Sequence, residues 1–146
     1  MARPIAVTEG QALAFPNVCL TSVPSAPSVP IPYPSIADLS SADEVSENVT
    51  VGGKGVILAT QSSVASTSGD EAGTDGGLVS LTNGGACQFP QGSASVQING
   101  KAVVRMGDPT EQNVGDPGAN AFGNVLSGDA SVLVGARLCQ RLLVRA

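Results

Sequence analysis

Residues 95–105 read Ser-Val-Gln-Ile-Asn-Gly-Lys-Ala-Val-Val-Arg, which describes a strand, a two-residue turn and a returning strand. Asn-Gly between alternating apolar residues is a strong short-range signal for a β-hairpin, because both residues tolerate the positive φ that a tight turn requires. Residues 49–58 repeat the pattern around Gly52-Gly53, and residues 131–139 form a weaker third copy. Three related hairpins in one chain predict an all-β fold with internal repetition.

A single hairpin is too small to remain folded in water, so the three hairpins must pack together. We therefore predict a compact cone in which they close around one axis with approximate threefold symmetry. The 18 Gly, 10 Pro and 3% aromatic residues favour short strands joined by turns and leave little room for helix. The 146 residues fit one domain, 1–146, with an N-terminal arm over 1–14. Residues 109–146 are expected to form a loop and the closing third hairpin, with a short helix as the alternative for 136–146.

The run Val29-Pro30-Ile31-Pro32-Tyr33-Pro34 alternates proline with larger apolar residues. The proline ring is incompatible with a helix interior, so the run predicts an extended, polyproline-like path. Val29, Ile31 and Tyr33 can then lie on a sheet while the prolines deny a neighbouring chain an edge to pair with. A free linker is the less favoured alternative, because linkers seldom carry regularly spaced large apolar residues.

A net charge of −5 argues against nucleic acid or an anionic membrane as partner. The last fifteen residues carry only basic charges, at Arg137, Arg141 and Arg145. We interpret them as a solvated basic tail, with contact to an acidic or polar partner surface as the alternative. The sequence shows neither a secretory signal nor a run of about 20 apolar residues. We therefore expect no stable membrane anchor, a cytoplasmic location, and export without a cleaved signal.

Three elements of the sequence, in order, resemble the PAAR-like domain family. The first is Phe15-Pro16-Asn17-Val18-Cys19-Leu20-Thr21 with Val29 to Ala37, and the second is Ser66-Thr67-Ser68-Gly69-Asp70-Glu71-Ala72-Gly73-Thr74. The third runs from Val96 to Asp108 and includes Gly100-Lys101-Ala102-Val103-Val104-Arg105. The resemblance spans residues 15 to about 113. The three elements together are specific for this family, whereas the Pro-rich run alone is not.

The resemblance implies a tip that caps and sharpens the trimeric valine-glycine-rich (VgrG) spike of a contractile injection system. Such a system is a type VI secretion apparatus, an extracellular contractile particle or a phage-like tail. In this family the tip is loaded in the bacterial cytoplasm, leaves with the spike on firing, punctures the target envelope and can deliver effectors. We accordingly expect one copy per spike trimer, and any effector or toxin to bind as a separate chain.

For such a cap, the three hairpins are expected to form the base that meets the spike. The expected docking residues are Val49, Val51, Val96, Ile98, Val132 and Val134. One alternative function is an adaptor that mainly holds a separate toxin, and a weaker one is a small hydrolase that uses the loop at Asp70 and Glu71. We expect no enzyme, and a Ser-His-Asp triad in particular is impossible because the chain has no His. Asp70 and Glu71 are instead expected to accept backbone N–H groups and fix a sharp loop.

The resemblance raises the question of a metal, because relatives in the wider PAAR group hold zinc with histidines and a cysteine. This chain has no His, and Asn113 ends the stretch after Asp108 in which some relatives place one. Cys19, Cys87 and Cys139 with a water or a carboxylate make up a sufficient zinc donor set. They lack the close Cys-x-x-Cys spacing of structural sites, so three unligated thiols are the favoured interpretation and cysteine-bound zinc is the alternative.

Overall fold

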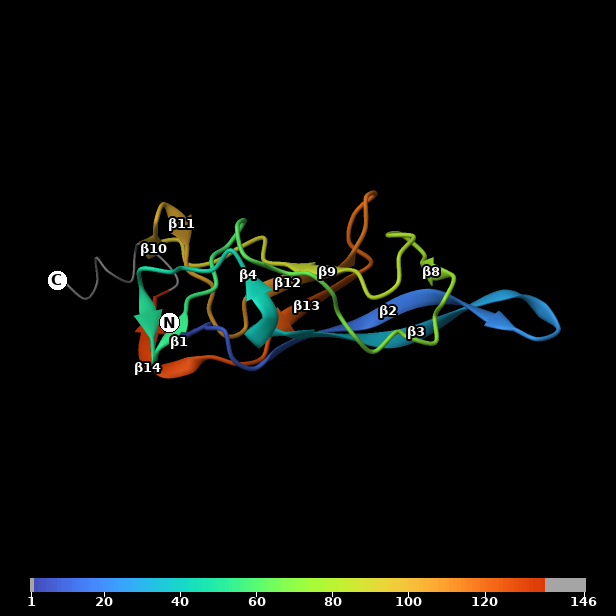
Figure 1. The fold of residues 1–146 in the computed structure, drawn as a ribbon, viewed down its shortest axis with the longest axis horizontal. Coiled ribbons are helices and arrows are strands. Elements are labelled where there is room, and N and C mark those ends of the chain that lie inside the picture. Colours follow the sequence, from blue (N-terminus) through green and yellow to red (C-terminus); the bar gives the residue numbers. More distant parts are fainter. Residues whose placement is uncertain (1, 136–146) are drawn as a thin grey trace.

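The computed structural model describes residues 2–135, which form strands, turns and one short 3₁₀ helix (Figure 1). The elements are β1 (Arg3–Ile5), β2 (Gln11–Val23), β3 (Ala26–Asp38), η1 (Leu39–Ser41), β4 (Ala42–Asp43), β5 (Thr50–Val51), β6 (Lys54–Gly55), β7 (Ser63–Val64), β8 (Gly76–Gly77), β9 (Ala86–Gln88), β10 (Gln97–Ile98), β11 (Lys101–Ala102), β12 (Pro109–Val114), β13 (Ala121–Val125) and β14 (Asp129–Val134). The prediction of an all-β fold is confirmed. Within this part of the chain, no helix has the length and apolar character needed to cross a bilayer.

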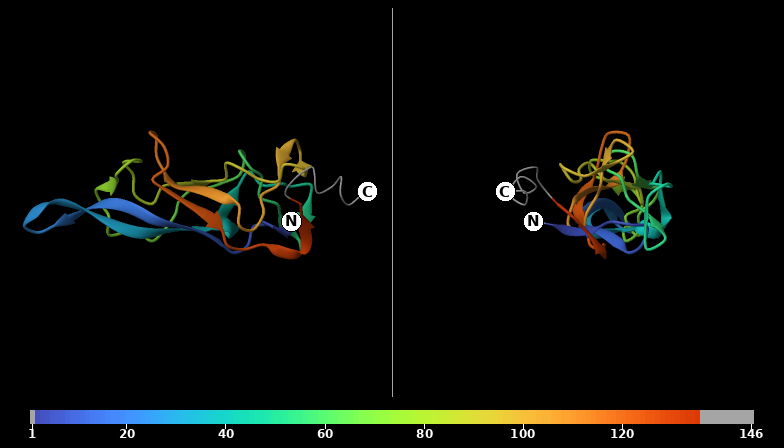
Figure 2. Two further views of the ribbon diagram at one scale, coloured as in Figure 1. Left: turned by 180° about the vertical axis from the view of Figure 1, so that it is seen from behind. Right: turned by 90° about the vertical axis from the view of Figure 1, so that its left-hand side faces the viewer.

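The molecule is elongated, and its two ends differ (Figures 1 and 2). The long hairpin of β2 and β3 projects at one end. The other end, which we call the base, consists of residues 3–7, 49–58, 95–105 and 129–134. Between the two ends runs the largest sheet, in the order β3-β2-β13-β12-β9-β7-β4.

The Pro-rich run lies in β3, at one end of the sheet order. Its three large apolar residues pair with β2 in the register Asn17↔Tyr33, Cys19↔Ile31 and Thr21↔Val29. The prolines are tolerated because a strand at the end of a sheet does not need every N–H for pairing. The predicted extended path on a sheet is confirmed.

Two of the three predicted hairpins form as expected, β5–β6 and β10–β11. Their two-residue turns have positive φ at both positions, 60° and 79° at Gly52 and Gly53, and 55° and 82° at Asn99 and Gly100. That conformation matches the right-handed twist of the flanking strands, and Gly and Asn adopt it at low cost. The turn chemistry alone was sufficient to locate both hairpins.

The third strand pair differs from the prediction. Residues 131–134 are extended in β14, but β14 pairs with β1 at the opposite end of the chain, in the register Arg3↔Val134. The predicted returning segment, 136–139, lies outside the described residues. Periodicity marks a segment as a strand without naming its partner, because pairing is set by tertiary packing.

Two segments have more regular structure than the sequence led us to predict. Residues 1–14 were predicted to be an arm, yet Arg3–Ile5 is a strand and Ile5, Ala6 and Val7 are buried. Residues from 109 were predicted to be a loop, yet β12 and β13 pair from Pro109↔Asn124 to Gln112↔Ala121. The sequence of β12 is mostly polar, so it does not indicate a strand. Its extended conformation is stabilised by hydrogen bonds to its two neighbours in the sheet, β13 and β9.

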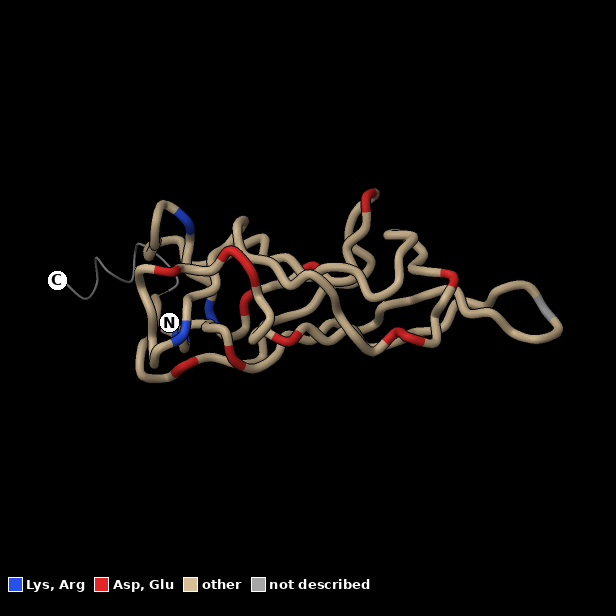
Figure 3. The backbone as a smooth tube through the Cα atoms, viewed as in Figure 1, with Lys and Arg blue, Asp and Glu red and all other residues tan. Residues whose placement is uncertain are grey.

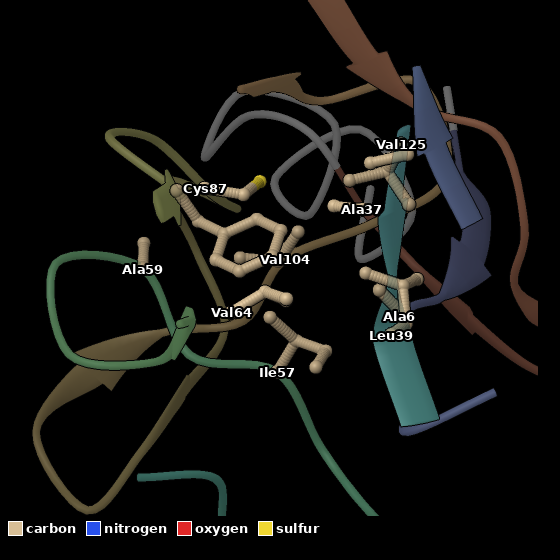
Figure 4. Packing of buried hydrophobic residues seen from close by; sticks show 11 residues of the cluster. Ala6, Ala37, Leu39, Ile57, Ala59, Val64, Cys87, Val104 and Val125 are labelled. Atoms are coloured by element: carbon tan, nitrogen blue, oxygen red, sulfur yellow. The ribbon is translucent and has the colours of Figure 1, made fainter. Parts of the chain in front are cut away.

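The buried apolar residues form two clusters. The first fills the body and includes Leu39, Ile57, Phe89 and Val104 (Figure 4). The second, the base cluster, lies among the base strands and consists of Ile5, Val7, Val56, Leu58, Val103 and Val134. The base is therefore a packed structure and not a set of loose hairpin ends.

Candidate functional site

Three short segments that are far apart in sequence meet in a closed ring at the base. The segments are residues 5–7, 56–58 and 103–105. The N–H of Ala6 donates to the carbonyl of Val104 over 2.9 Å, that of Val104 to Ile57 over 3.1 Å, and that of Ile57 to Ala6 over 3.0 Å. The antiparallel bridges Ile5↔Arg105, Val7↔Val56 and Leu58↔Val103 join the segments on all three sides. Each segment therefore contacts the other two in the same way, which gives the base an approximate threefold axis.

One strand of a pair leads into each ring segment: β1 into residues 5–7, β6 into 56–58 and β11 into 103–105. The partner strands are β14 for β1, β5 for β6 and β10 for β11. The three cross-strand residue pairs Arg3↔Val134, Lys54↔Val51 and Lys101↔Ile98 occupy corresponding positions. The predicted arrangement of three strand pairs around one axis is present, with β1 as the partner of β14.

The third sector of the ring departs from this symmetry. Arg105 stands where the other two segments have Val7 and Leu58, and it is 5% exposed. Its guanidinium binds Asp108 through Nε (3.0 Å) and Nη2 (2.8 Å), and Arg3 reaches the same carboxylate over 2.7 Å. A buried ion pair of this kind is maintained by hydrogen bonds to every charged group. Here Asp108 also accepts the backbone N–H of Arg105 over 2.8 Å.

The six predicted docking residues all lie at the base but differ in accessibility. Val49 and Val132 are 40% and 37% exposed. Three others pack against the base cluster and are half-buried: Val51, Val96 and Ile98. Val134 is 3% exposed and belongs to the cluster itself, so its side chain is enclosed within the base.

A second constellation is a polar cluster at the root of the β2–β3 hairpin. Its centre is Asn17, which is fully buried and donates from Nδ2 to Asp70 Oδ2 over 2.9 Å. Asn17 Oδ1 accepts from Nδ2 of Asn113 (3.1 Å) and of Asn120 (2.6 Å). The Cys19 thiol lies 3.7 Å from Asn17 Oδ1 and 3.8 Å from Asp70 Oδ2. The cluster ties β2, β12, the start of β13 and the loop at Asp70 to one another.

Asp70 and Glu71 both fix their loop, as the sequence led us to expect. Asp70 is 1% exposed and accepts the N–H of Gly84 over 3.1 Å, while the exposed Glu71 accepts the N–H of Gly69. The N–H of Gly69 and, after it, the backbone N–H of Glu71 itself lower the pKa of the Glu71 carboxyl. Position 73 requires glycine, because a Cβ at this position would lie 2.5 Å from Cys19 Cβ. A carboxylate as enclosed as that of Asp70 is not accessible to a substrate.

Comparison with known proteins identifies the family. The chain matches the toxin PAAR-like domain over residues 10–123. It belongs to the PAAR-like domain family. Domains of this family are associated with type VI secretion spikes and their effectors. Neither the curated proteins nor the solved structures gave a match.

The residues of this PAAR-like domain do not fit the zinc site of the wider group. Cys19 is surrounded by amide groups, and Asn113 Nδ2 points at its sulfur over 3.8 Å. Burial first, then the charge of Asp70 and a hydrogen bond to it, raise the pKa of Cys19 to about 11, so the thiol is neutral. Cys87 points into the apolar cluster of the body, where burial raises its pKa to about 12 (Figure 4). Cys139 lies outside the described residues, and within them no three His, Cys, Asp or Glu side chains gather as a metal site.

Sequence reasoning missed the asparagines of the polar cluster and the ion pair at Asp108. Asn17 was visible as a polar residue inside an apolar strand, in Phe-Pro-Asn-Val-Cys-Leu. Asn113 was noted only as the end of the stretch in which some relatives place a His, and Asn120 gave no signal, because the role of both depends on where β12 and β13 lie in the sheet. Asp108 and Arg105 are three residues apart, so the sequence could have indicated their contact as part of a turn. The contact of Asp108 with Arg3 joins distant parts of the chain and could not be predicted in this way.

Proposed function

We propose that this PAAR-like domain is a structural cap, without enzymatic activity, that sits base-down on a trimeric VgrG-like spike, one copy per trimer. The observation that carries the proposal is the closed ring of Ala6, Ile57 and Val104, in which each of the three ring segments adjoins one strand pair. A single chain can contact three identical subunits in equivalent ways only if it repeats a surface three times around an axis. Three weak contacts made together also bind more tightly than their individual strengths suggest.

The opposite end of the molecule suits the leading position in envelope puncture. The β2–β3 hairpin carries no Lys, Arg, Asp or Glu between Glu9 and Asp38, and it projects beyond the rest of the body (Figure 3). Asp75 accepts hydrogen bonds from Ser22 and Ser28 and thereby braces the hairpin near its turn. A charge-free, braced hairpin costs less to push into apolar material than one with charged side chains. The cap would be loaded in the cytoplasm and would leave with the spike on firing.

Capping is tested by mixing the purified domain with a purified VgrG-like spike trimer and measuring the mass of the complex by light scattering. We expect one domain per trimer. Val132→Asp places a charge on an exposed residue of the base and should abolish the complex. Leu81→Asp, at a residue that is 71% exposed on the loop after β8, is the matched control and should leave it intact. A wild-type domain that remains monomeric beside the trimer would refute the proposal.

A second function, as an adaptor for a separate toxin, is favoured by one observation. Phe15 and Phe122 are 61% and 66% exposed on the neighbouring strands β2 and β13, beside the exposed Leu13 and Leu126. Exposed aromatic residues on one sheet face are typical of protein interaction sites. A toxin that is soluble only when coexpressed with the wild-type domain, and not with Phe122→Ser, would support the adaptor role. Capping of the spike should be unaffected by that substitution.

A further inference from the structure

The basic residues of the described chain are confined to the base. Of the seven Lys and Arg residues, Arg137, Arg141 and Arg145 lie beyond the described part. The remaining four are Arg3, Lys54, Lys101 and Arg105. Figure 3 shows them at the end that carries β1, β10, β11 and β14, whereas Asp and Glu are spread along the molecule. Arg105 is buried against Asp108, which leaves three cations at the rim of the base.

These three cations, the cation trio of Arg3, Lys54 and Lys101, follow the threefold arrangement of the ring. Each stands two residues before the first residue of its ring segment, namely Ile5, Val56 and Val103. Each is also the direct cross-strand partner of an apolar residue that packs in or against the base cluster. Directly opposed residues of an antiparallel pair share one face, so the three stems lie beside the base cluster. Their charged groups extend from that apolar surface to water.

Contacts within the chain leave much of this charge available. Arg3 donates to Asp108, but its side chain is still 34% exposed. Lys54 acts on Asp129, whose pKa is lowered by the hydroxyl and N–H of Ser131 and also by this lysine. Within residues 2–135 neither Lys54 nor Lys101 forms a salt bridge. The two lysines are therefore the members of the trio with the most charge to offer a partner.

We propose that the cation trio binds acidic groups of the spike, one carboxylate on each of the three subunits. The proposal rests on the capping function and names the chemistry of its contact. A symmetric trimer presents any surface carboxylate three times around its axis, which matches three cations placed around the ring. Complementary charges at a rim guide the orientation of docking and raise its rate. The other explanation is that the lysines only protect two short hairpins from pairing with strand edges of other chains, and it requires no acidic partner.

The test compares the affinity of variants for the purified VgrG-like spike trimer between low and high salt. Lys54→Gln with Lys101→Gln removes two of the three charges and leaves the ion pair of Arg3 with Asp108 intact. Ser66→Glu with Thr74→Glu is the matched control, because it shifts the net charge equally at exposed residues of the loop between β7 and β8. Lys54→Arg with Lys101→Arg keeps both charges and shows whether any loss is due to charge or to packing.

We expect the Gln pair to bind about tenfold more weakly at low salt, with a shallower dependence on ionic strength. The Arg pair and the control should bind like wild type, and all variants should have the same circular dichroism. If the Gln pair binds with unchanged affinity and salt dependence, the cation trio is not the contact, although the capping function stands. Equal weakening by the control would mean that only net charge matters, and this also overturns the proposal. Failure of the wild type to bind would remove both the trio and the capping function.

Discussion

Replacement of Asp70 by Ala tests whether the polar cluster holds the β2–β3 hairpin to the body. Asp70 Oδ2 accepts from Asn17 Nδ2 and from the N–H of Gly84, and both donors lose their partner in the variant. A buried donor left without a partner costs about 1–3 kcal/mol. Asp70 Oδ1 is itself buried without a partner, so its removal returns part of this cost. We therefore expect a loss of about 2–4 kcal/mol in the free energy of unfolding.

Asp70→Asn separates hydrogen bonding from side-chain removal. Its amide oxygen can take the place of Oδ2 and still accept both bonds, now without the extra strength of a charged acceptor. The expected loss is about 1–2 kcal/mol, clearly below that of Asp70→Ala. Thr74→Ala, at an exposed side chain of the same loop, is the control and should unfold like wild type.

Unfolding in urea is followed by far-ultraviolet circular dichroism and by the fluorescence of the single tyrosine, Tyr33, which lies on β3. A chelator should not move the midpoint, because the cluster is held by amides and a carboxylate. If Asp70→Ala unfolds at the wild-type urea concentration, the cluster does not stabilise the fold. A large loss on adding chelator would instead show that a metal holds the tip.

Two further predictions concern the ring and the buried thiols. Ile57→Ala should lower the free energy of unfolding by about 2–5 kcal/mol, because Ile57 is fully buried in the ring. Val49→Ala, at the exposed edge of the base, should lower it by less than about 0.5 kcal/mol in the same urea titration. Equal effects at the two positions would contradict a packed ring. Cys19 and Cys87 have raised pKa values in the folded protein, of about 11 and about 12, so they favour the neutral thiol and add stability that is complete below about pH 9. The free energy of unfolding should fall as the pH rises from about 9 towards 12, and less steeply in Cys87→Ala; an unchanged slope in that variant would count against the burial of its thiol.

Much of the fold was predictable where local chemistry decides the conformation. Gly52-Gly53 and Asn99-Gly100 specify their turns because few other residues adopt positive φ at two consecutive positions. The alternation of proline with Val29, Ile31 and Tyr33 specifies an extended strand because the ring of proline excludes helix. The role of Asp70 as an acceptor of backbone N–H groups also followed from its place in a Gly-rich loop.

The partner of β14, the burial of Val134 and the meeting of Asn17 with Asn113 and Asn120 were decided only by the tertiary structure. Each depends on which strands become neighbours, and neighbours are chosen by the burial of apolar surface over the whole chain. Sequence alone determined that the protein is a β-structure built from repeated short hairpins, because turn geometry and periodicity are local properties. The closed ring of Ala6, Ile57 and Val104 is a long-range property, since its three hydrogen bonds exist only when all three segments are in place.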